Sequence, residues 1–424
     1  MIDLKPIPVE RAILIGLISN DYTREQVEEH LDELEMLTST AGAETVFKIM
    51  QDRQRPDPAF FVGKGKAEEI AQLIELNDIR LVIFDDDLNP TQARNLEKLF
   101  ERKVLDRSGL ILDIFASHAK TREAKTQVEL AQLQYMLPRL TRAWTHLSKQ
   151  YGGIGTKGPG ETQIETDRRI IRTRISKLKE NLKKIEAQQT TKSAGRKDQV
   201  TACLVGYTNA GKSTLLNRLT NAGVLAEDKL FATLDSTTRS FDIEKNKKVL
   251  LSDTVGFIRK LPHHLVASFK STLNVVRDAD IILHVIDVSH DFYEDHIHVV
   301  DSTLEELNSH KKIQIKIFNK VDALNDKSKM DYILNKYKNS ILISAERGIN
   351  IGNLKKMLLD LYEKNFVQGT IALSHSDSKL VSQLYEMAEV LSADYEDDKI
   401  IITYRANSAV HSKIQALVRS RQDN

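Results

Sequence analysis

Residues 200–219 read VTACLVGYTNAGKSTLLNRL, and this stretch decides the fold. Its first part is an apolar run that predicts a strand, and its last part predicts a helix. Between them, Gly206, Gly211, Lys212 and Ser213 satisfy the pattern G-x-x-x-x-G-K-[ST]. In such a phosphate-binding loop, or P-loop, backbone N–H groups and the helix N-terminus hold phosphates. The alternative is a glycine turn that only resembles a P-loop, and the flanking strand and helix argue against it.

The P-loop pattern assigns roles to individual residues. Lys212 is expected to reach the β- and γ-phosphates of a nucleotide, and Ser213 is expected to bind Mg²⁺. The residues predicted to line the nucleotide along this loop are Gly206, Asn209, Ala210, Gly211, Lys212, Ser213 and Thr214. The loop alone does not distinguish ATP from GTP, so that choice depends on the motifs that follow.

The next motif is DTVG (253–256), which comes after the predicted strand KVLLS. Asp253 is expected in the Mg²⁺ shell, and the Gly256 N–H is expected to bind the γ-phosphate. A carboxylate is a ligand that Mg²⁺ takes, and a backbone N–H can donate to a phosphate oxygen.

The motif NKVD (319–322) selects the base. Asp322 can accept hydrogen bonds from both N–H groups on the Watson–Crick edge of guanine, which adenine cannot match. Lys320 can lie along the purine face, and Asn319 can tie this loop to the P-loop. These roles predict GTP rather than ATP as the nucleotide.

A last motif, SAERG (344–348), follows the predicted strand SILI. The Ala345 N–H can meet the guanine carbonyl, and Ser344 stands beside it in the predicted nucleotide site. Each short motif is common by chance, but the order, spacing and position of the set after strands are highly specific.

This set of motifs resembles the P-loop GTPases of the translation-factor-related class. Within that class, FATLDSTTR (231–239) is similar to a switch I segment, and Thr233 aligns with the threonine that closes on Mg²⁺. Thr237 is a second candidate, and ordinary loop threonines are the alternative for both. The resemblance implies Mg²⁺ ligands at Ser213, Thr233 and Asp253. It implies catalytic roles for Lys212, Thr233 and Gly256.

The residue at position 257 predicts slow hydrolysis of the nucleotide. Ras-like enzymes use a glutamine after the D-x-x-G motif to orient the attacking water. Phe257 stands there instead and cannot hydrogen-bond to water, so we expect a partner or an ion to supply what is missing. Asn209 matches the P-loop asparagine of related GTPases that recruit K⁺, and K⁺ dependence is a further implication of the resemblance.

The composition predicts a cytoplasmic protein of several domains. At 424 residues, with 41% apolar and 29% charged residues, the chain is too long for one core. No apolar run is long enough to cross a bilayer, and we expect neither a signal peptide nor stable membrane insertion. The single cysteine, Cys203, excludes an internal disulfide and is expected to be buried and inert.

The charge is unevenly distributed. Residues 120–197 contain 18 Lys and Arg against 7 Asp and Glu, an excess of 11 positive charges, so the rest of the chain carries −10 of the total of +1. A basic segment in an acidic protein suggests a polyanionic partner. A solvated, lysine-rich helical face is the alternative.

Strand and helix patterns alternate near the N-terminus. Strands are predicted at 12–18, 44–50 and 80–86, and helices at 23–37, 66–76 and 90–102. This alternation predicts a small α/β domain with a largely parallel sheet. The acidic cluster Asp85–Asp87 ends one strand, where a solvated strand end is favoured over a cleft.

The middle of the chain predicts two helices. Apolar residues recur at steps of three and four from Leu130 to Leu147, and the pattern returns from Ile164 to Ile185 with one step of seven followed by steps of four and three. Two such stripes around a short loop predict an antiparallel hairpin. Pro138, inside the first stripe, is expected to kink or briefly break the first helix.

Four domains are therefore predicted, and the overall fold class is α/β multidomain. They are an N-terminal α/β domain (1–118), an antiparallel helical hairpin with a glycine-rich tip (119–192), a Ras-like P-loop G domain with a doubly wound, mostly parallel sheet (199–364), and a small α+β C-terminal domain (366–424). In the last, a helix is expected near 381–391, a strand at 399–404 and a helix after Asn407.

The hairpin tip reads YGGIGTKGPG (151–160), and Gly153, Gly155 and Gly158 satisfy G-x-G-x-x-G. The dinucleotide-binding interpretation needs a strand before the glycines, whereas a helix precedes them here, so this interpretation fails. Small residues at the tip of a basic hairpin instead let backbone approach a crowded partner. The residues predicted to contact RNA are Gly153, Gly155, Lys157, Gly158, Arg168, Arg169, Arg172 and Arg174.

The segment GGIGTKGPGETQIETDRR (152–169), placed before a G domain, is similar to the signature of the HflX GTPases. FVGKGKAEEI (61–70) and residues 108–140 also match that family, so the resemblance covers nearly the whole chain. It implies binding to the large ribosomal subunit, with the hairpin loop near the peptidyl-transferase centre, and the splitting, rescue or recycling of ribosomes under stress. It also implies GTP and GDP as ligands. ATP binding has been proposed for the N-terminal domain of relatives, but a second P-loop is absent from this sequence.

A second hypothesis remains open at this point. The chain could be a GTP switch for a protein or membrane complex, with the hairpin as a coiled-coil adaptor and with partial association at the membrane. Four arginines within seven residues favour the ribosomal hypothesis. RNA modification or helicase activity has no motif to support it. A monomer is favoured. The histidines His296 and His298 are two residues apart, so they would face different sides of a helix, and we do not expect them to bind a metal together.

Overall fold

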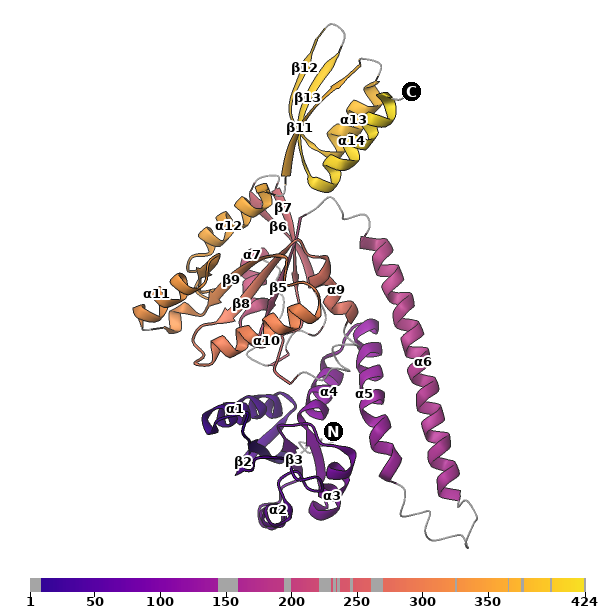
Figure 1. Ribbon diagram of the computed structural model, residues 1–424, viewed down its shortest axis with the longest axis vertical. Coiled ribbons are helices and arrows are strands. Elements are labelled where there is room, and N and C mark those ends of the chain that lie inside the picture. Colours follow the sequence, from indigo (N-terminus) through magenta and orange to yellow (C-terminus); the bar gives the residue numbers. More distant parts are fainter. Residues whose placement is uncertain are drawn as a thin grey trace, which may run out of the picture.

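The structure, a computed structural model, describes residues 9–143, 159–193, 200–220, 230–231, 234, 237–244, 247–260, 270–324, 326–364, 366–374, 377–396 and 399–422. Three sheets follow one another along the chain. Two long helices come between the first and the second sheet in sequence, and they lie beside these sheets in space (Figure 1). Among the described residues, no helix is long and apolar enough to cross a membrane.

The first sheet has the order β2-β1-β3-β4, and all its pairs are parallel. Its strands are β1 (Glu10–Ile18), β2 (Ala43–Asp52), β3 (Leu81–Phe84) and β4 (Lys103–Asp106). Its helices are α1 (Arg24–Thr40), α2 (Lys64–Leu76), α3 (Pro90–Phe100) and α4 (Arg107–His118). The predicted small α/β architecture is confirmed, with β4 and α4 in addition. We call residues 9–118 the N-terminal unit.

Local signals explain where the helices of the N-terminal unit begin. Thr23 and Gln26 form a reciprocal capping box at the start of α1, and Asn89 and Gln92 form another at the start of α3. Pro90 occupies the first turn of α3, where its missing N–H costs nothing. The strands β1 and β3 are buried on both faces, which explains why their sequences are continuous apolar runs rather than alternating ones.

Two helices, α5 (Arg122–Ala143) and α6 (Pro159–Ser193), form the predicted hairpin, and they run antiparallel (Figure 1). The helix α5 continues through Pro138, so of the two predicted outcomes, a kink or a brief break, the break does not occur. One lost backbone hydrogen bond is tolerated because the flanking turns of α5 pack on α6. The apolar contact is formed by Leu130, Leu133, Leu137, Ile171, Ile175, Leu178 and Leu182. The predicted glycine-rich tip lies outside the described residues.

The second sheet has the order β10-β9-β8-β5-β7-β6, and only the β6–β7 pair is antiparallel. Its strands are β5 (Val200–Gly206), β6 (Thr237–Glu244), β7 (Lys247–Asp253), β8 (Ile281–Asp287), β9 (Ile313–Asn319) and β10 (Ser340–Leu342). Its helices are α7 (Lys212–Thr220), α9 (Lys270–Asp278), α10 (Tyr293–Glu306), α11 (Lys327–Lys336) and α12 (Ile351–Lys364). Separate apolar cores on the two faces, one with α7 and α12 and one with α9 and α10, confirm the predicted doubly wound, mostly parallel sheet.

The third sheet is antiparallel, with the order β11-β13-β12. Its elements are β11 (Phe366–Leu373), α13 (Ser378–Met387), β12 (Glu389–Tyr395), β13 (Ile400–Asn407) and α14 (Ser408–Gln422). The helix expected to reach residue 391 ends at Met387, because the next residues pair with β13 instead of continuing the helix. The predicted α+β class holds, although β11 and β12 were not predicted.

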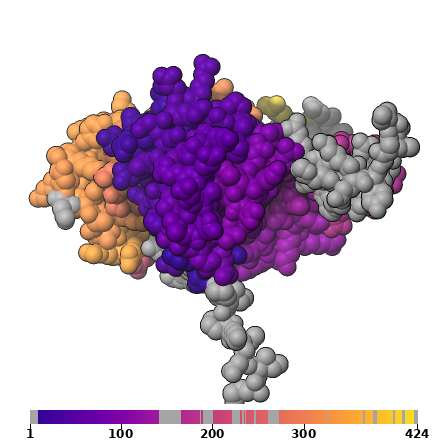
Figure 2. Space-filling view, turned by 90° about the horizontal axis from the view of Figure 1, so that it is seen from below, coloured from indigo at the N-terminus to yellow at the C-terminus, as the bar shows by residue number. Residues whose placement is uncertain are grey.

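Figure 2 views the molecule from the end that the N-terminal unit occupies. The unit stands in front of the elements of the second sheet, with the hairpin beside it. The N-terminal unit packs on residues that follow β5 and β7, at the carboxyl end of these strands, and its contacts there bear on the functional site.

Candidate functional site

The P-loop connects β5 to α7 in a conformation that needs glycine at two points. Gly206 has φ +154° and Gly211 has φ +89°. A Cβ atom at Gly206 would collide with the Val285 carbonyl oxygen, and one at Gly211 would collide with the Asn319 side chain. Asn209 takes φ 59°, a left-handed value that asparagine tolerates. The predicted loop residues thus form one tight turn.

Lys212 points into this turn. Its ammonium donates to the carbonyl oxygens of Gly206, at 3.1 Å, and Tyr207, at 2.7 Å. Burial lowers the pKa of Lys212 to about 8, although the charge of Asp253 acts in the opposite direction. A buried ammonium held by carbonyls alone is poised to receive an anionic phosphate.

The two predicted Mg²⁺ ligands that the structure describes lie together. The Ser213 hydroxyl donates to Asp253 Oδ2 at 2.6 Å, and Oδ1 of this buried carboxylate accepts from the Thr254 N–H at 2.9 Å. A hydroxyl and a carboxylate on the phosphate side of a P-loop are hard oxygen ligands that fit Mg²⁺. Thr233 lies outside the described residues, whereas Thr237 begins β6 and pairs with Asp253.

The residues after Asp253 run against the P-loop. Gly256 is so close that a Cβ atom there would lie 2.8 Å from Thr208 Cα and 3.0 Å from Lys212 Nζ. The Phe257 N–H donates to the Gly206 carbonyl at 3.0 Å, and the Phe257 carbonyl accepts from the Thr208 N–H at 2.8 Å. The Phe257 ring itself packs in the core with α9 and α10. The ring therefore offers a nucleotide-bound water nothing to bind.

Asn319 ties the predicted base-binding loops to the P-loop. Its Nδ2 donates to the Ala210 carbonyl at 2.9 Å, and its Oδ1 accepts from the Ala345 N–H at 2.9 Å. Because the side chain is buried and both of its ends are used, three loops far apart in sequence are held in one geometry.

The other two residues of this motif stand at the rim of the predicted base site. A hydrogen bond with the Ser344 hydroxyl lowers the pKa of Asp322. The positive charges of Arg347 and Lys320 lower this pKa further. Asp322 is therefore ionised and oriented. The Lys320 ammonium lies 2.7 Å from Asp287 Oδ2. The structure thus brings the P-loop, Asp253, Asn319, Asp322 and Ala345 around one site.

Three family models match successive parts of this chain. They are described as GTP-binding GTPase N-terminal (residues 28–116), GTP-binding GTPase middle region (118–196) and 50S ribosome-binding GTPase (201–320). The GTPase HflX of Flavobacterium psychrophilum is 50% identical over 351 residues, which are 80% of this chain and 85% of the relative. The GTPase HflX of Escherichia coli K12 is 44% identical over 392 residues, 92% of this chain and 91% of the relative. That of Lacrimispora saccharolytica is 44% identical over 425 residues, 100% of this chain and 98% of the relative.

The chain belongs to the HflX family of GTPases. It binds GTP and hydrolyses it to GDP and phosphate. In this family member, the P-loop and the segment after Asp253 also contact the N-terminal unit, which the sequence did not indicate.

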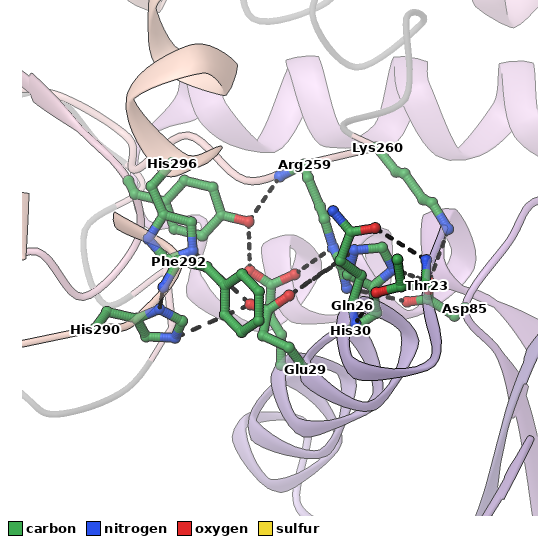
Figure 3. Close-up of polar contacts among 12 residues, drawn as sticks. Thr23, Gln26, Glu29, His30, Asp85, Arg259, Lys260, His290, Phe292 and His296 are labelled. Atoms are coloured by element: carbon green, nitrogen blue, oxygen red, sulfur yellow. Dashed lines mark hydrogen bonds and ion pairs between the residues drawn. The ribbon is translucent and has the colours of Figure 1, made fainter. Parts of the chain in front are cut away.

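A buried ionic cluster forms this contact. Arg107 of α4 is 1% exposed and pairs with Glu33 of α1 and, at 2.7 Å, with Asp85 at the end of β3. Burial alone would lower the pKa of Arg107, but the charges of Glu33 and Asp85 raise it. From the other side, Arg259 Nε lies 3.0 Å from Glu33, and Lys260 Nζ lies 2.7 Å from Asp85 (Figure 3). Asp85 is therefore not the solvated strand end that the sequence favoured, because cations from two units enclose it.

The P-loop takes part through Tyr207. Its hydroxyl donates to Glu33 at 2.6 Å and accepts from the Arg259 N–H at 3.1 Å. Phe231, in the predicted switch I segment, packs edge-on against Phe115 of α4 with ring centroids 4.7 Å apart. Both nucleotide-facing segments thus touch the N-terminal unit.

The predicted RNA-contacting arginines differ among themselves. Arg169 and Arg172 are exposed on α6, and Arg168 is half-buried. Arg174 instead forms a two-bonded ion pair with Glu129 of α5, at 2.7 and 3.0 Å. Arg174 therefore braces the hairpin, whereas the other three belong to its open face. Cys203 is fully buried as expected, and burial raises the pKa of its thiol.

Asp322→Asn replaces one of the two acceptor oxygens with a donor NH₂ group. The hydrogen bond from the guanine amino group to a charged acceptor, worth about 1.5–3 kcal/mol, is lost, so GTP affinity should fall at least about tenfold. Affinity for xanthosine triphosphate, which offers an acceptor where guanine has its amino group, should rise. Asp326→Asn, the same exchange at the exposed cap of α11, is the control. Titration of both nucleotides measures the preference, and an unchanged preference in Asp322→Asn would exclude the assignment.

The lowered pKa of Lys212 predicts pH-dependent nucleotide binding. Phosphate raises this pKa in the complex, so binding is strongest below about pH 8 and weakens as pH rises from there towards the pKa of the complex. Binding at pH 8.5 should take up a proton, which calorimetry in two buffers of different ionisation enthalpy detects. Lys212→Arg, whose guanidinium stays charged, should show no uptake, and the absence of uptake by the unaltered chain would contradict this account.

Proposed function

We propose that this HflX-family GTPase binds the large ribosomal subunit and uses GTP-dependent switching to split, rescue or recycle ribosomes under stress. The match of residues 201–320 to a 50S ribosome-binding GTPase model supports this function. The observation that carries it in the structure is the basic face of the hairpin.

That face lies on α6, close to the hairpin tip. Arg168, Arg169 and Arg172 line a shallow groove together with Glu165, Thr166, Thr173 and Ser176. Guanidinium groups bind phosphates in pairs of hydrogen bonds, and the hydroxyls can add single ones. With 11 excess positive charges between residues 120 and 197, the hairpin suits ribosomal RNA. Gly153, Gly155, Lys157 and Gly158 would then reach RNA near the peptidyl-transferase centre.

In this proposal, GTP hydrolysis at the nucleotide site determines when the protein acts on the ribosome. Ser213, Asp253 and Thr233 would hold Mg²⁺, which neutralises charge that develops on the phosphates. Asn209 is the residue through which K⁺ would act. Because the Phe257 ring is packed in the core, hydrolysis by the chain alone is slow, and contact with the ribosome supplies the missing acceleration.

The remaining assignments belong to the same proposal. The four predicted domains, 1–118, 119–192, 199–364 and 366–424, act as separate parts of a monomer in the cytoplasm. In the nucleotide site, Gly256 and Lys212 bind the γ-phosphate, and Asn319, Lys320, Asp322, Ser344 and Ala345 bind the base.

The structure weakens the adaptor hypothesis. An adaptor would need an apolar seam free for a partner helix, but the described parts of the two stripes, Leu130 to Leu137 and Ile171 to Leu182, are packed against each other. What the described part of α6 exposes is mainly charged. An RNA partner therefore fits the hairpin better than a coiled-coil partner does.

The test removes the three arginines, Arg168, Arg169 and Arg172, by replacement with alanine. Binding to purified large subunits should weaken, and the slope of log affinity against log salt should flatten by about 2–3, since each phosphate contact contributes about 0.7–0.9. The control replaces Lys179, Lys183 and Lys184 with alanine. These substitutions remove the same charge from the same helix, at positions farther from the tip.

Equal effects of the two triple variants would indicate general attraction without a defined face. Subunit binding that persists after deletion of residues 152–160, or that ribonuclease does not affect, would overturn the proposal and favour a protein partner.

A further inference from the structure

Three side chains of metal-binding type meet where the N-terminal unit touches the second sheet. Glu29 comes from α1, His296 comes from α10, and His290 comes from the loop that enters α10. Figure 3 shows the two imidazoles on one side of Glu29. Glu29 is far from the two histidines in sequence, so no local motif predicted the group.

The ligand atoms of the three side chains surround one point. They all lie within 4.8 Å of one another, and Glu29 Oε1 is 4.0 Å from His290 Nε2 and 3.9 Å from His296 Nε2. These distances are too long for hydrogen bonds. Ligands of a tetrahedral Zn²⁺ ion lie about 3.3 Å apart, given bonds of about 2.0–2.1 Å. Side-chain adjustments of less than about 1 Å would therefore close the group around a metal.

Glu29 supplies the carboxylate of the group, and its two oxygens face different partners. Arg259 Nη1 lies 3.5 Å from the second oxygen, Oε2, and leaves Oε1 to the two histidines.

The surroundings hold the histidines in place. The His296 ring is stacked on the Tyr207 ring, with centroids 3.8 Å apart and planes inclined by 7°. Nδ1 of His290 accepts from the Phe292 N–H at 3.2 Å, which places the proton of the neutral ring on Nε2. A metal at Nε2 requires this proton to move to Nδ1, where it displaces that hydrogen bond. This exchange costs one local hydrogen bond.

We propose that Glu29, His290 and His296 form a binding site for a divalent transition metal of the zinc type. Two imidazoles and one carboxylate are a ligand set that Zn²⁺ takes, with the fourth position left to water, and Mg²⁺ does not favour imidazole. The side chains are partly exposed, from 13% for His296 to 39% for His290, so an ion can enter from solvent.

The site has a mechanical consequence because its ligands come from both sides of a contact. The metal is bound completely only while α1 is docked on the second sheet, so the ion stabilises that docking, and undocking weakens binding of the ion. His296 stacks on Tyr207, which belongs to the P-loop, so one proposed metal ligand contacts the P-loop directly. The inference concerns the chain itself and stands whether or not the ribosome is its partner.

The test titrates Zn²⁺ into the full chain by calorimetry, with saturating GDP and millimolar Mg²⁺ present to occupy the nucleotide site. We expect one Zn²⁺ per chain, and His290→Ala and Glu29→Gln should each weaken its affinity at least tenfold. His298→Ala removes an exposed histidine two residues from His296 on the same helix and should leave the affinity unchanged. Thermal unfolding gives a second measurement, in which Zn²⁺ should raise the Tm of the unaltered chain but not that of His290→Ala.

His290 is the primary position because its side chain is the most exposed of the three, so its replacement should leave the fold intact. Circular dichroism of each variant checks this. No Zn²⁺ binding by the unaltered chain would overturn the proposal. Equal losses in His290→Ala and His298→Ala would overturn it too, since they would indicate scattered surface histidines.

Discussion

The buried guanidinium of Arg107 is the interaction on which the arrangement of this molecule depends. It lies between Glu33 and Asp85, all three side chains are almost fully buried, and water cannot neutralise them. In this group, the two carboxylates of Glu33 and Asp85 outnumber the single cation of Arg107. Arg259 and Lys260 supply the missing positive charge from the far side of the contact. Removing one partner of such a group typically costs about 3–5 kcal/mol, so the cluster specifies one docking position.

This position joins the N-terminal unit to the segments that a GTPase moves. Arg259 and Lys260 follow the D-x-x-G motif, Tyr207 belongs to the P-loop, and Phe231 lies in the predicted switch I segment. A γ-phosphate orders such segments and its loss releases them. The contact of the N-terminal unit therefore includes residues of these segments. The proposed metal site lies at the rim of the same contact.

Much of the G domain could be predicted from the sequence because its chemistry is local. The P-loop, DTVG and NKVD are short runs after strands, and the hairpin follows from its heptad-like stripes. Other predictions were wrong, and some elements were not predicted, for physical reasons. The helix expected to reach residue 391 yields to pairing with β13, and β4 is four residues long, too short to show a pattern.

The ionic contact could not be predicted at all. Glu33 and Arg259 are 226 residues apart, and neither stands in a motif. Asp85 looked like a solvated strand end because its cations come from α4 and from the segment after DTVG. His290 and His296 likewise gain a carboxylate only through the docking of α1. Such sites depend on how units pack, and a single sequence does not encode that visibly.

The measurement that tests the central claim most directly is GTP turnover by the purified chain in K⁺ buffer, alone and with purified large ribosomal subunits. The account predicts slow turnover alone, since Phe257 offers the attacking water nothing, and stimulation that approaches the 10³- to 10⁵-fold range of supplied catalytic groups. Turnover that is slow and unchanged by the subunits would contradict the account and separate this GTPase from the ribosome.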